Sequence, residues 1–230
     1  MERESVAHQR IGLFRYLWEV RFAGTKDAKK KRLVALSFDD GPHSNITLQV
    51  LRILNTHVTS ATFFWIVKEA DLLAKNDPKQ FQAILTALRT GDHEVGLHAP
   101  YDYRPTLRSR LLGQFTGEEM TEATKKLREL TGMPVTLYRP HYFQFGSSFR
   151  FANELGLTAV LWNPFHYAPT NWSSESQIRQ FSSAKPGNIL LFHDGVTSTR
   201  PETNVLEVLP QVLVNLKRRD LYPTSVSKVL

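Results

Sequence analysis

LVALSFDDGP, residues 33–42, has the pattern of a buried strand that ends in two adjacent carboxylates. Burying two carboxylates costs free energy unless they are paired, protonated or bound to a cation. Side chains alternate between the two faces of a strand, so a break at Gly41-Pro42 is needed for Asp39 and Asp40 to point into one cleft. The alternative is a solvated turn, which the Asp-Asp-Gly-Pro composition also allows. The rest of the chain decides between these interpretations.

Short apolar segments alternate with amphipathic helical patterns from residue 33 to the C-terminus. We expect strands near residues 33–38, 61–66, 94–98, 135–138, 157–162, 188–192 and 222–226. A capping box at Thr116–Glu119 begins one of the helices, and Gly132 ends it. Seven such alternations predict a parallel, barrel-like α/β fold. We expect a single catalytic domain over residues 33–230, preceded by a helical and basic extension over residues 1–32.

Composition limits the kind of site that the chain can build. Its 230 residues are enough for one sizeable core, and the 41% hydrophobic and 22% charged contents are those of an ordinary globular protein. The chain has no cysteine, which excludes disulfides and thiolate metal sites. Any metal must therefore be held by histidines and carboxylates, a ligand set that suits zinc and similar divalent ions.

The net charge of +7 favours anionic partners, such as a wall polymer. The densest basic run is Lys26–Arg32, but it lacks the interleaved aromatic residues of a nucleic-acid surface, so we expect no nucleic-acid partner. No apolar stretch is long enough for stable membrane insertion. The N-terminus has no secretory signal peptide, so we expect either a cytoplasmic protein or an exported one whose leader has been removed.

Unusual polar and aromatic residues fall where the expected strands end. In a parallel barrel the carboxyl ends of the strands meet at one rim, where the working residues lie. Five strands end in such groups: Asp39 with Asp40, His98, Arg139, Trp162, and His193 with Asp194. This pattern predicts one functional site at that rim.

Three of these side chains have the chemistry of a catalytic metal site. His98 and Asp102 are four residues apart, so they share a face if the chain makes a helical turn there. With Asp40 they form a set of three ligands that leaves positions open for water and substrate. We expect a divalent metal, zinc first, with cobalt, manganese or nickel as alternatives. Without Asp40 and Asp102, the lone His98 would more simply be a hydrogen-bonded rim histidine.

The remaining rim residues complete a hydrolytic site. A metal activates water and polarises a carbonyl, so Asp39 is the candidate base that takes the proton. His193 is placed to protonate a leaving group, although it can also be a structural donor. Arg139 can pair with a carboxylate and lower its pKa, or form a surface ion pair of little consequence. The backbone N–H of Tyr142 can face a developing oxyanion. These parts describe hydrolysis of an amide or ester.

Two tryptophans are candidates for substrate binding. Trp162 and Trp172 can wall a small apolar pocket, with ordinary core packing as the alternative.

Five motifs in order resemble those of the NodB-type polysaccharide deacetylases of carbohydrate esterase family 4. They are SFDDGP at 37–42, ATFF at 61–64, EVGLH at 94–98, YRPHY at 138–142 and LLFHD at 190–194. The resemblance implies a distorted (β/α) barrel of about seven parallel strands. It also implies metal-dependent removal of N-acetyl groups from N-acetylglucosamine polymers such as chitin or peptidoglycan.

The resemblance assigns roles to individual positions of this chain. It implies Asp39 as base, Asp40 and His98 as metal ligands, and His193 as acid. It also places the backbone N–H of Tyr142 in an oxyanion hole and lets Arg139 tune the base.

The chain departs from the family pattern at several of these positions. Asp102 stands where the family has a second metal-binding histidine. The added negative charge weakens the metal as a Lewis acid and changes its preferred identity, or else no metal binds. Asn171 replaces an aspartate that supports the catalytic histidine, and an amide does not stabilise an imidazolium, so His193 is expected to be a weaker acid. His141 replaces a proline, and His166 lies in a longer loop; both are either compensating polar groups or neutral variation.

Three functions fit this sequence. The first is a metal-dependent N-deacetylase of N-acetylglucosamine-containing saccharides. The second is a catalytically impaired relative that keeps the barrel as a sugar-binding or interaction module, and the third is a hydrolase of a small amide.

Overall fold

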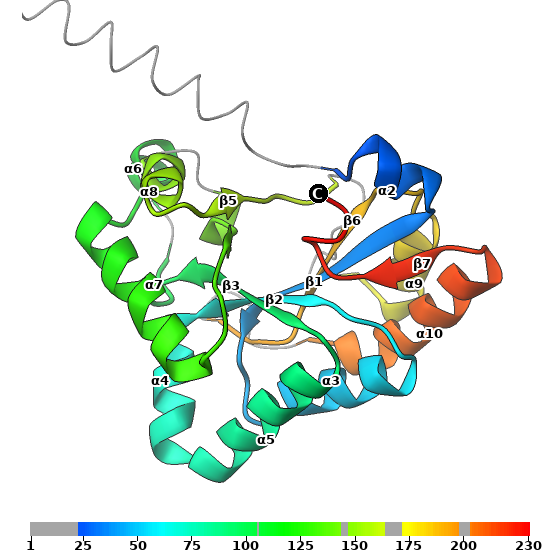
Figure 1. Ribbon diagram of the computed structural model, residues 1–230, viewed down its shortest axis with the longest axis horizontal. Helices are drawn as coiled ribbons and strands as arrows, with labels where there is room; N and C mark the ends of the chain where they lie inside the picture. The colour runs from blue at the N-terminus through cyan, green and yellow to red at the C-terminus, as the bar shows by residue number, and fades with distance from the viewer. Residues whose placement is uncertain (1–22, 105, 144–146, 164–171, 198–202) are drawn as a thin grey trace, which may run out of the picture.

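A seven-stranded parallel sheet forms the centre of the molecule in the computed structural model, and helices lie around its outside (Figure 1). The structure describes residues 23–104, 106–143, 147–163, 172–197 and 203–230. The strand order is β5-β4-β3-β2-β1-β6, and β7 pairs with the first residues of β1. The expected distorted parallel barrel is confirmed.

Each strand lies within or close to a segment expected from the sequence. The strands are β1 Leu33–Gly41, β2 Thr62–Ile66, β3 Glu94–Ala99, β4 Leu137–Tyr138, β5 Thr158–Ala159, β6 Ile189–His193 and β7 Tyr222–Thr224. β5 is shorter than expected. The carbonyl groups of Val160 and Leu161, which follow it, accept hydrogen bonds from the buried Arg139 guanidinium.

Among the residues that the structure describes, one helix precedes β1, and the others lie between the strands in chain order. The helices are α2 Lys26–Lys30, α3 Thr47–Thr56, α4 Val67–Asn76, α5 Pro78–Thr90, α6 Leu107–Leu112, α7 Gly117–Thr131, α8 Ser148–Glu154, α9 Ser174–Ser182 and α10 Val205–Arg218, with a 3-10 turn η1 at His141–Phe143. The capping box predicted for α7 is present between Thr116 and Glu119, and Gly132 ends that helix in a left-handed conformation.

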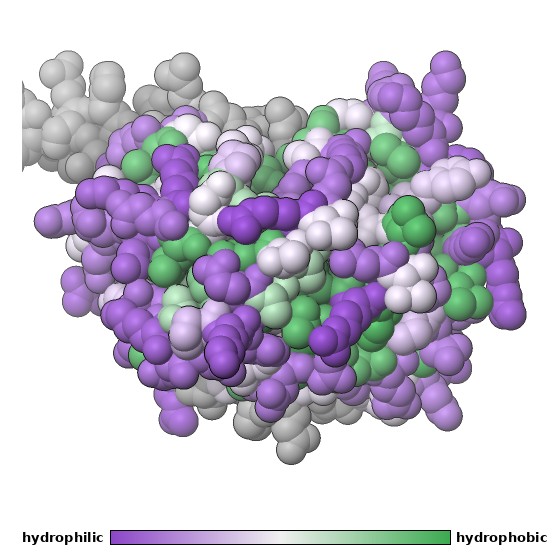
Figure 2. Space-filling view, turned by 60° about the horizontal axis from the view of Figure 1, so that its bottom comes forward, coloured by the Kyte–Doolittle hydropathy of each residue, from purple (hydrophilic) through white to green (hydrophobic). Residues whose placement is uncertain are grey.

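The core explains why the central strands are continuous apolar runs. β1 is buried from Val34 to Gly41, and β2 and β6 are buried throughout, as expected for parallel strands covered on both faces. Three phenylalanine rings stack across them: Phe38 lies 4.9 Å from Phe63 and 5.3 Å from Phe192. On the face shown in Figure 2, hydrophilic side chains project outward and hydrophobic residues lie deeper between them.

The segment before β1 packs against the C-terminal end of the chain. The backbone N–H of Gly24 donates to Gly187, that of Thr25 donates to Val229, and Ala28 of α2 is buried. Residues 1–22 lie outside the described residues, so the expected boundary at residue 33 stays a prediction. Within the described part of the chain, no helix has the length and apolar content needed to cross a membrane.

Candidate functional site

The carboxyl end of β1 turns two consecutive carboxylates toward one histidine. Asp40 has a φ of +70°, and the pairing with β2 shifts register between Asp39 and Gly41, so the alternation of a regular strand is broken there. Asp40 Oδ1 lies 3.3 Å and Asp39 Oδ2 3.9 Å from His98 Nε2, which comes from β3. All three side chains are buried.

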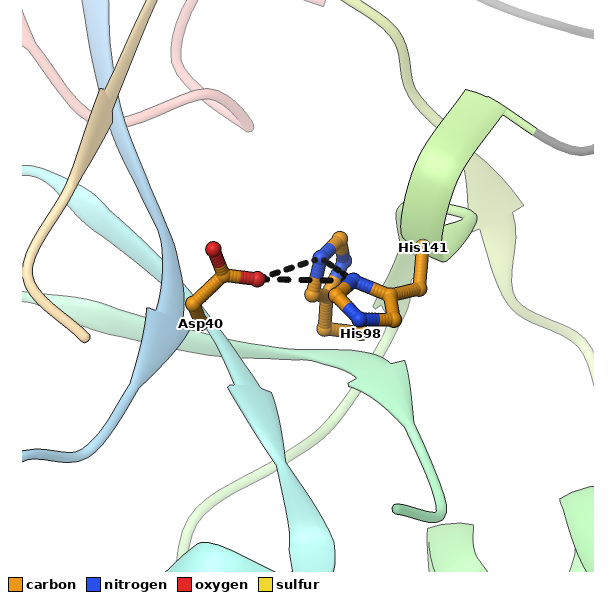
Figure 3. Close-up of side chains that lie close together, drawn as sticks. All are labelled: Asp40, His98 and His141. Carbon is orange, nitrogen blue, oxygen red and sulfur yellow. Dashed lines mark hydrogen bonds and ion pairs between the residues drawn. The ribbon is translucent and has the colours of Figure 1, made fainter. Parts of the chain in front are cut away.

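A third buried residue, His141, completes a compact group of possible metal ligands (Figure 3). His141 Nδ1 lies 2.8 Å from His98 Nε2 and 3.4 Å from Asp40 Oδ1. Metal–ligand bonds of about 2.0–2.1 Å in a tetrahedral site put ligand atoms roughly 3.3 Å apart. The separations of this group are therefore close to those that a zinc-sized ion requires.

Hydrogen bonds to the far side of each ring determine which nitrogen can bind a cation. His98 Nδ1 lies 2.8 Å from the backbone oxygen of Arg139, and His141 Nε2 lies 3.0 Å from Asp102 Oδ1. Both oxygens only accept, so both of these nitrogens carry the proton. In the neutral rings, the lone pairs of His98 Nε2 and His141 Nδ1 then face each other and Asp40 Oδ1. Three converging acceptors need a cation between them, so the donor set fits a divalent metal.

The pKa shifts show how strongly the charges of the group are coupled. Burial lowers the pKa of His98, but the carboxylates of Asp39 and Asp40 outweigh it, so this pKa is raised and His98 is the ring that takes up a proton when no metal competes for it. Burial raises the pKa of Asp40, but the interactions with His98, His193 and His141 outweigh it, so that pKa lies well below its usual value. Burial lowers the pKa of His141, which favours the neutral ring that a metal ligand needs.

Asp102 does not occupy the place expected from its spacing. The helical turn expected from His98 to Asp102 is absent: β3 runs on to Ala99, and residues 100–104 are irregular. The structure therefore brings His141, rather than Asp102, next to Asp40 and His98, and Asp102 lies behind His141.

Asp39 is held by a buried guanidinium. Arg139 Nη1 donates to Asp39 Oδ1 at 2.9 Å and to Ser37 Oγ at 2.7 Å, and the guanidinium lies over the ring of Phe64. The pairing of Arg139 with a carboxylate is thus present, and it is fully buried rather than at the surface. Sequence reasoning gave Ser37 no role, although it is the first residue of the SFDDGP motif.

His193 approaches the carboxylate of Asp40 from β6. It lies directly across from Asp39 in the β1–β6 pairing, and its Nε2 is 4.0 Å from Asp40 Oδ2. The two oxygens of Asp40 therefore face different histidines, since Oδ1 is the oxygen near His98 and His141.

Of the other candidate residues, Tyr142 and Trp162 contact residues of this centre, whereas Trp172 lies in a hollow that no residue of the centre lines. Tyr142 has a φ of +54°, and its hydroxyl lies 3.4 Å from Asp102 Oδ1; the role of its backbone N–H stays a prediction. Trp162 is half-buried, with its ring 5.9 Å from the Arg139 guanidinium. Trp172 is 39% exposed and lines a surface hollow of about 390 Å³ along α9. Asn171 and His166 lie outside the described residues.

Residues 26–160 match the sequence profile of the family described as polysaccharide deacetylase. A chitooligosaccharide deacetylase from Azorhizobium caulinodans is 30% identical over 168 residues, which are 70% of this chain and 73% of that protein. A peptidoglycan-N-acetylglucosamine deacetylase from Bacillus cereus is 27% identical over 217 residues, which are 93% of this chain and 92% of that protein.

Solved structures share the fold at low sequence identity. The Bc1960 peptidoglycan N-acetylglucosamine deacetylase superposes with a TM-score of 0.73 at 20% identity, covering 92% of each chain. BA3943 of Bacillus anthracis, a pseudoenzyme of carbohydrate esterase family 4, superposes with a TM-score of 0.69 at 16% identity, covering 91% of this chain and 68% of that one.

Proposed function

Because this chain belongs to the polysaccharide deacetylase family, we propose that it is a metal-dependent hydrolase that removes N-acetyl groups from N-acetylglucosamine-containing oligo- or polysaccharides. The similar proteins act on chitooligosaccharide and on peptidoglycan N-acetylglucosamine, which supports this class of substrate. The single observation that carries the proposal is the convergence of Asp40, His98 and His141 beside an Arg139-paired Asp39.

Asp40, His98 and His141 would hold the metal through Oδ1, Nε2 and Nδ1. One carboxylate and two imidazoles suit zinc, with cobalt, manganese or nickel as alternatives. When bound, the ion supplies Lewis acidity, which lowers the pKa of a water and polarises an acetyl carbonyl.

The chain's own residues move the protons. Asp39 takes a proton from the water that attacks the acetyl carbonyl carbon, while Arg139 holds its other oxygen in place. As the carbon–nitrogen bond breaks, His193 gives a proton to the sugar nitrogen. The products are acetate and a free amino sugar.

Three further residues have supporting roles in this proposal. The backbone N–H of Tyr142 donates to the developing oxyanion, and Trp162 and Trp172 contact the sugar. Asn171 is the expected neighbour of His193. An amide there would orient the imidazole without stabilising its positive charge. We therefore expect this chain to turn over more slowly than family members that have an aspartate at this position.

The positive charge of the chain favours an anionic glycan. Residues 26–32, 185 and 217–220 hold nine cations and two carboxylates, an excess equal to the net charge of +7 of the whole chain. They gather near the amino ends of the strands: Arg32 donates to the backbone oxygens of Arg219 and Asp220, and Arg219 donates to that of Ala184. We call these residues the basic surface, and it faces away from the candidate site.

The catalytically impaired module is the second candidate function, and Asn171 is the residue that favours it. Asp102 is a weaker argument for an impaired module, because His141 would supply the third metal ligand. A hydrolase of a small amide would use the same residues and differ only in what it accepts.

Acetate release tests the proposal. Chelator-stripped protein is incubated with N-acetylglucosamine oligomers, peptidoglycan or small amides after zinc, cobalt, manganese or nickel is added back. We expect metal-dependent release from the glycans.

Asp39→Asn is the matched variant for this assay. It removes the base while keeping a side chain of the same shape, so we expect turnover to fall at least about 100-fold and metal affinity to persist. Unchanged turnover would remove Asp39 as the base. No release from any glycan by folded, metal-loaded protein would favour the module, and release from small amides alone would favour the third function.

A further inference from the structure

Asp102 and His141 form a partly buried pair that joins the loop after β3 to the turn after β4. Asp102 Oδ1 lies 3.0 Å from His141 Nε2, and the Asp102 side chain is 20% exposed whereas that of His141 is 3% exposed. The same oxygen lies 3.4 Å from the hydroxyl of Tyr142. The carboxylate thus turns toward the outer edge of the His141 ring, away from Asp40 and His98.

The pair determines which nitrogen of His141 is available. A carboxylate only accepts hydrogen bonds, so Nε2 must carry the proton. The lone pair of the neutral ring is then on Nδ1, which is the atom 2.8 Å from His98 Nε2 and 3.4 Å from Asp40 Oδ1. With the opposite tautomer, an N–H would point at the two other ligand atoms, and His141 could not bind a metal.

Neighbouring side chains hold the ring in this orientation. The ring of Tyr142 lies 4.0 Å and that of Tyr103 5.6 Å from the His141 ring, and the Tyr103 hydroxyl donates to the backbone oxygen of His141 at 3.4 Å. The positive φ of Tyr142 allows two successive side chains, His141 and Tyr142, to reach the same carboxylate.

We propose that Asp102 is a positioning residue for metal binding, which acts through His141 and directs His141 Nδ1 to the metal. This inference rests on the proposed metal centre. Hydrogen-bonded carboxylates behind ligating histidines fix the tautomer and raise ligand basicity, and losing one typically lowers metal affinity 10- to 100-fold.

Metal affinity tests the proposal without relying on activity. Zinc affinity is measured by competition with a chromophoric chelator for the wild type, Asp102→Asn, Asp102→Ala and His141→Ala. We expect Asp102→Ala to bind zinc about 10- to 100-fold more weakly. Asp102→Asn should lose less, since the amide oxygen still accepts from Nε2. His141→Ala should lose more than either, because it removes a ligand.

Ring nitrogen NMR of the zinc form reports the mechanism directly. We expect a protonated Nε2 and a metal-shifted Nδ1 for His141 in the wild type and in Asp102→Asn. If Asp102 were purely structural, replacing it would lower only the thermal stability. Asp92→Asn is the control: this carboxylate is exposed and pairs with Lys228, so zinc affinity should not change.

Several outcomes would overturn the inference. If Asp102→Ala binds zinc as tightly as the wild type, Asp102 has no part in metal binding. Wild-type affinity in His141→Ala, with a large loss in Asp102→Asn, would make Asp102 the ligand itself. A wild type that binds no metal would overturn the metal centre and this inference together, whereas tight binding without acetate release would count only against the proposed activity.

Discussion

Arg139 connects the catalytic and metal-binding halves of the candidate site at the scale of a single residue. Its guanidinium donates to Asp39, and its backbone oxygen accepts from His98 Nδ1. Three more of its guanidinium N–H groups donate, to Ser37 Oγ and to the backbone oxygens of Val160 and Leu161. One buried residue therefore fixes the position of the proposed base and the tautomer of a proposed ligand.

Replacing Arg139 tests how much the buried ion pair contributes to stability. Arg139→Met leaves Asp39 buried without its cation, so we expect the free energy of unfolding to fall by about 3–5 kcal/mol. Arg139→Lys keeps the charge but not the planar fork, and should lose less. Urea unfolding of metal-free protein measures both. A loss below about 1 kcal/mol in Arg139→Met would show that water or another cation replaces the guanidinium.

His93 gives the folded state a specific sensitivity to acid. Its Nδ1 accepts from the backbone N–H of Ala61, and its Nε2 lies 2.9 Å from Asn55 Oδ1, so the buried ring must be neutral. Burial lowers the pKa of His93 to about 4, against 6.5 for the free side chain. The unfolded chain therefore binds the extra proton between these two pH values, and the folded chain does not.

Stability should accordingly fall as the pH drops from 6.5 to 4, by roughly 3 kcal/mol from His93. His93→Gln should be less stable at pH 7 and have a flatter pH dependence in this window. His57→Gln is the matched control, because His57 is exposed. Urea midpoints across the window provide the measurement, and parallel curves for wild type and His93→Gln would refute the assignment.

At the scale of elements, the site depends on how closely the ends of β1 and β6 approach. The backbone N–H groups of Asp194 and Gly195 both point to the backbone oxygen of Asp39. The Asp194 carboxylate accepts from Thr47 Oγ1 at 2.6 Å, which ties the end of β6 to the start of α3. A side chain at residue 195 has no room, since its Cβ would lie 1.8 Å from the backbone oxygen of Asp40.

Gly195→Ala should therefore disturb the metal site through the backbone. We expect a loss of at least 1–3 kcal/mol from overpacking and weaker zinc binding, because Asp40 must move. Gly156→Ala is the matched control: its φ is +69° but its Cβ would meet open space, so it should lose about 1 kcal/mol and keep its zinc affinity. Equal zinc affinity in the two variants would contradict this account of the close approach.

At the scale of the whole molecule, the basic surface predicts how the protein meets an anionic glycan. Exposed charges are screened over a Debye length of about 8–10 Å at physiological salt. We expect sedimentation with anionic cell-wall polymer to weaken steeply as salt rises. The combined variant Lys29→Glu, Lys30→Glu and Lys185→Glu should lose most of this binding while hydrolysing short neutral oligomers at the wild-type rate.

A matched triple variant outside the basic surface, Arg52→Glu, Lys79→Glu and Lys125→Glu, changes the net charge equally. Equal losses in the two triple variants would show that overall charge, rather than the basic surface, governs the binding.

The positions of the strands along the chain and the residues at their ends followed from local patterns. Apolar runs of strand length, the SFDDGP motif and the capping box at Thr116 each act through neighbouring residues, so they can be recognised without the fold. For the same reason the sequence predicted that Asp39, Asp40, His98, Arg139 and His193 lie at one rim.

The third member of the group of possible metal ligands was decided only by the tertiary structure. The four-residue spacing of His98 and Asp102 places them on one face only in a helix, and the chain is extended and then irregular there. His141 is 43 residues from His98 in the sequence, and no local spacing connects them; β3–β4 pairing and the left-handed Tyr142 bring the rings together. The sequence alone thus determined the fold and the rim that carries the site. Which side chains come close enough to hold a metal depended on long-range packing, because a metal site is defined by distances in space rather than along the chain.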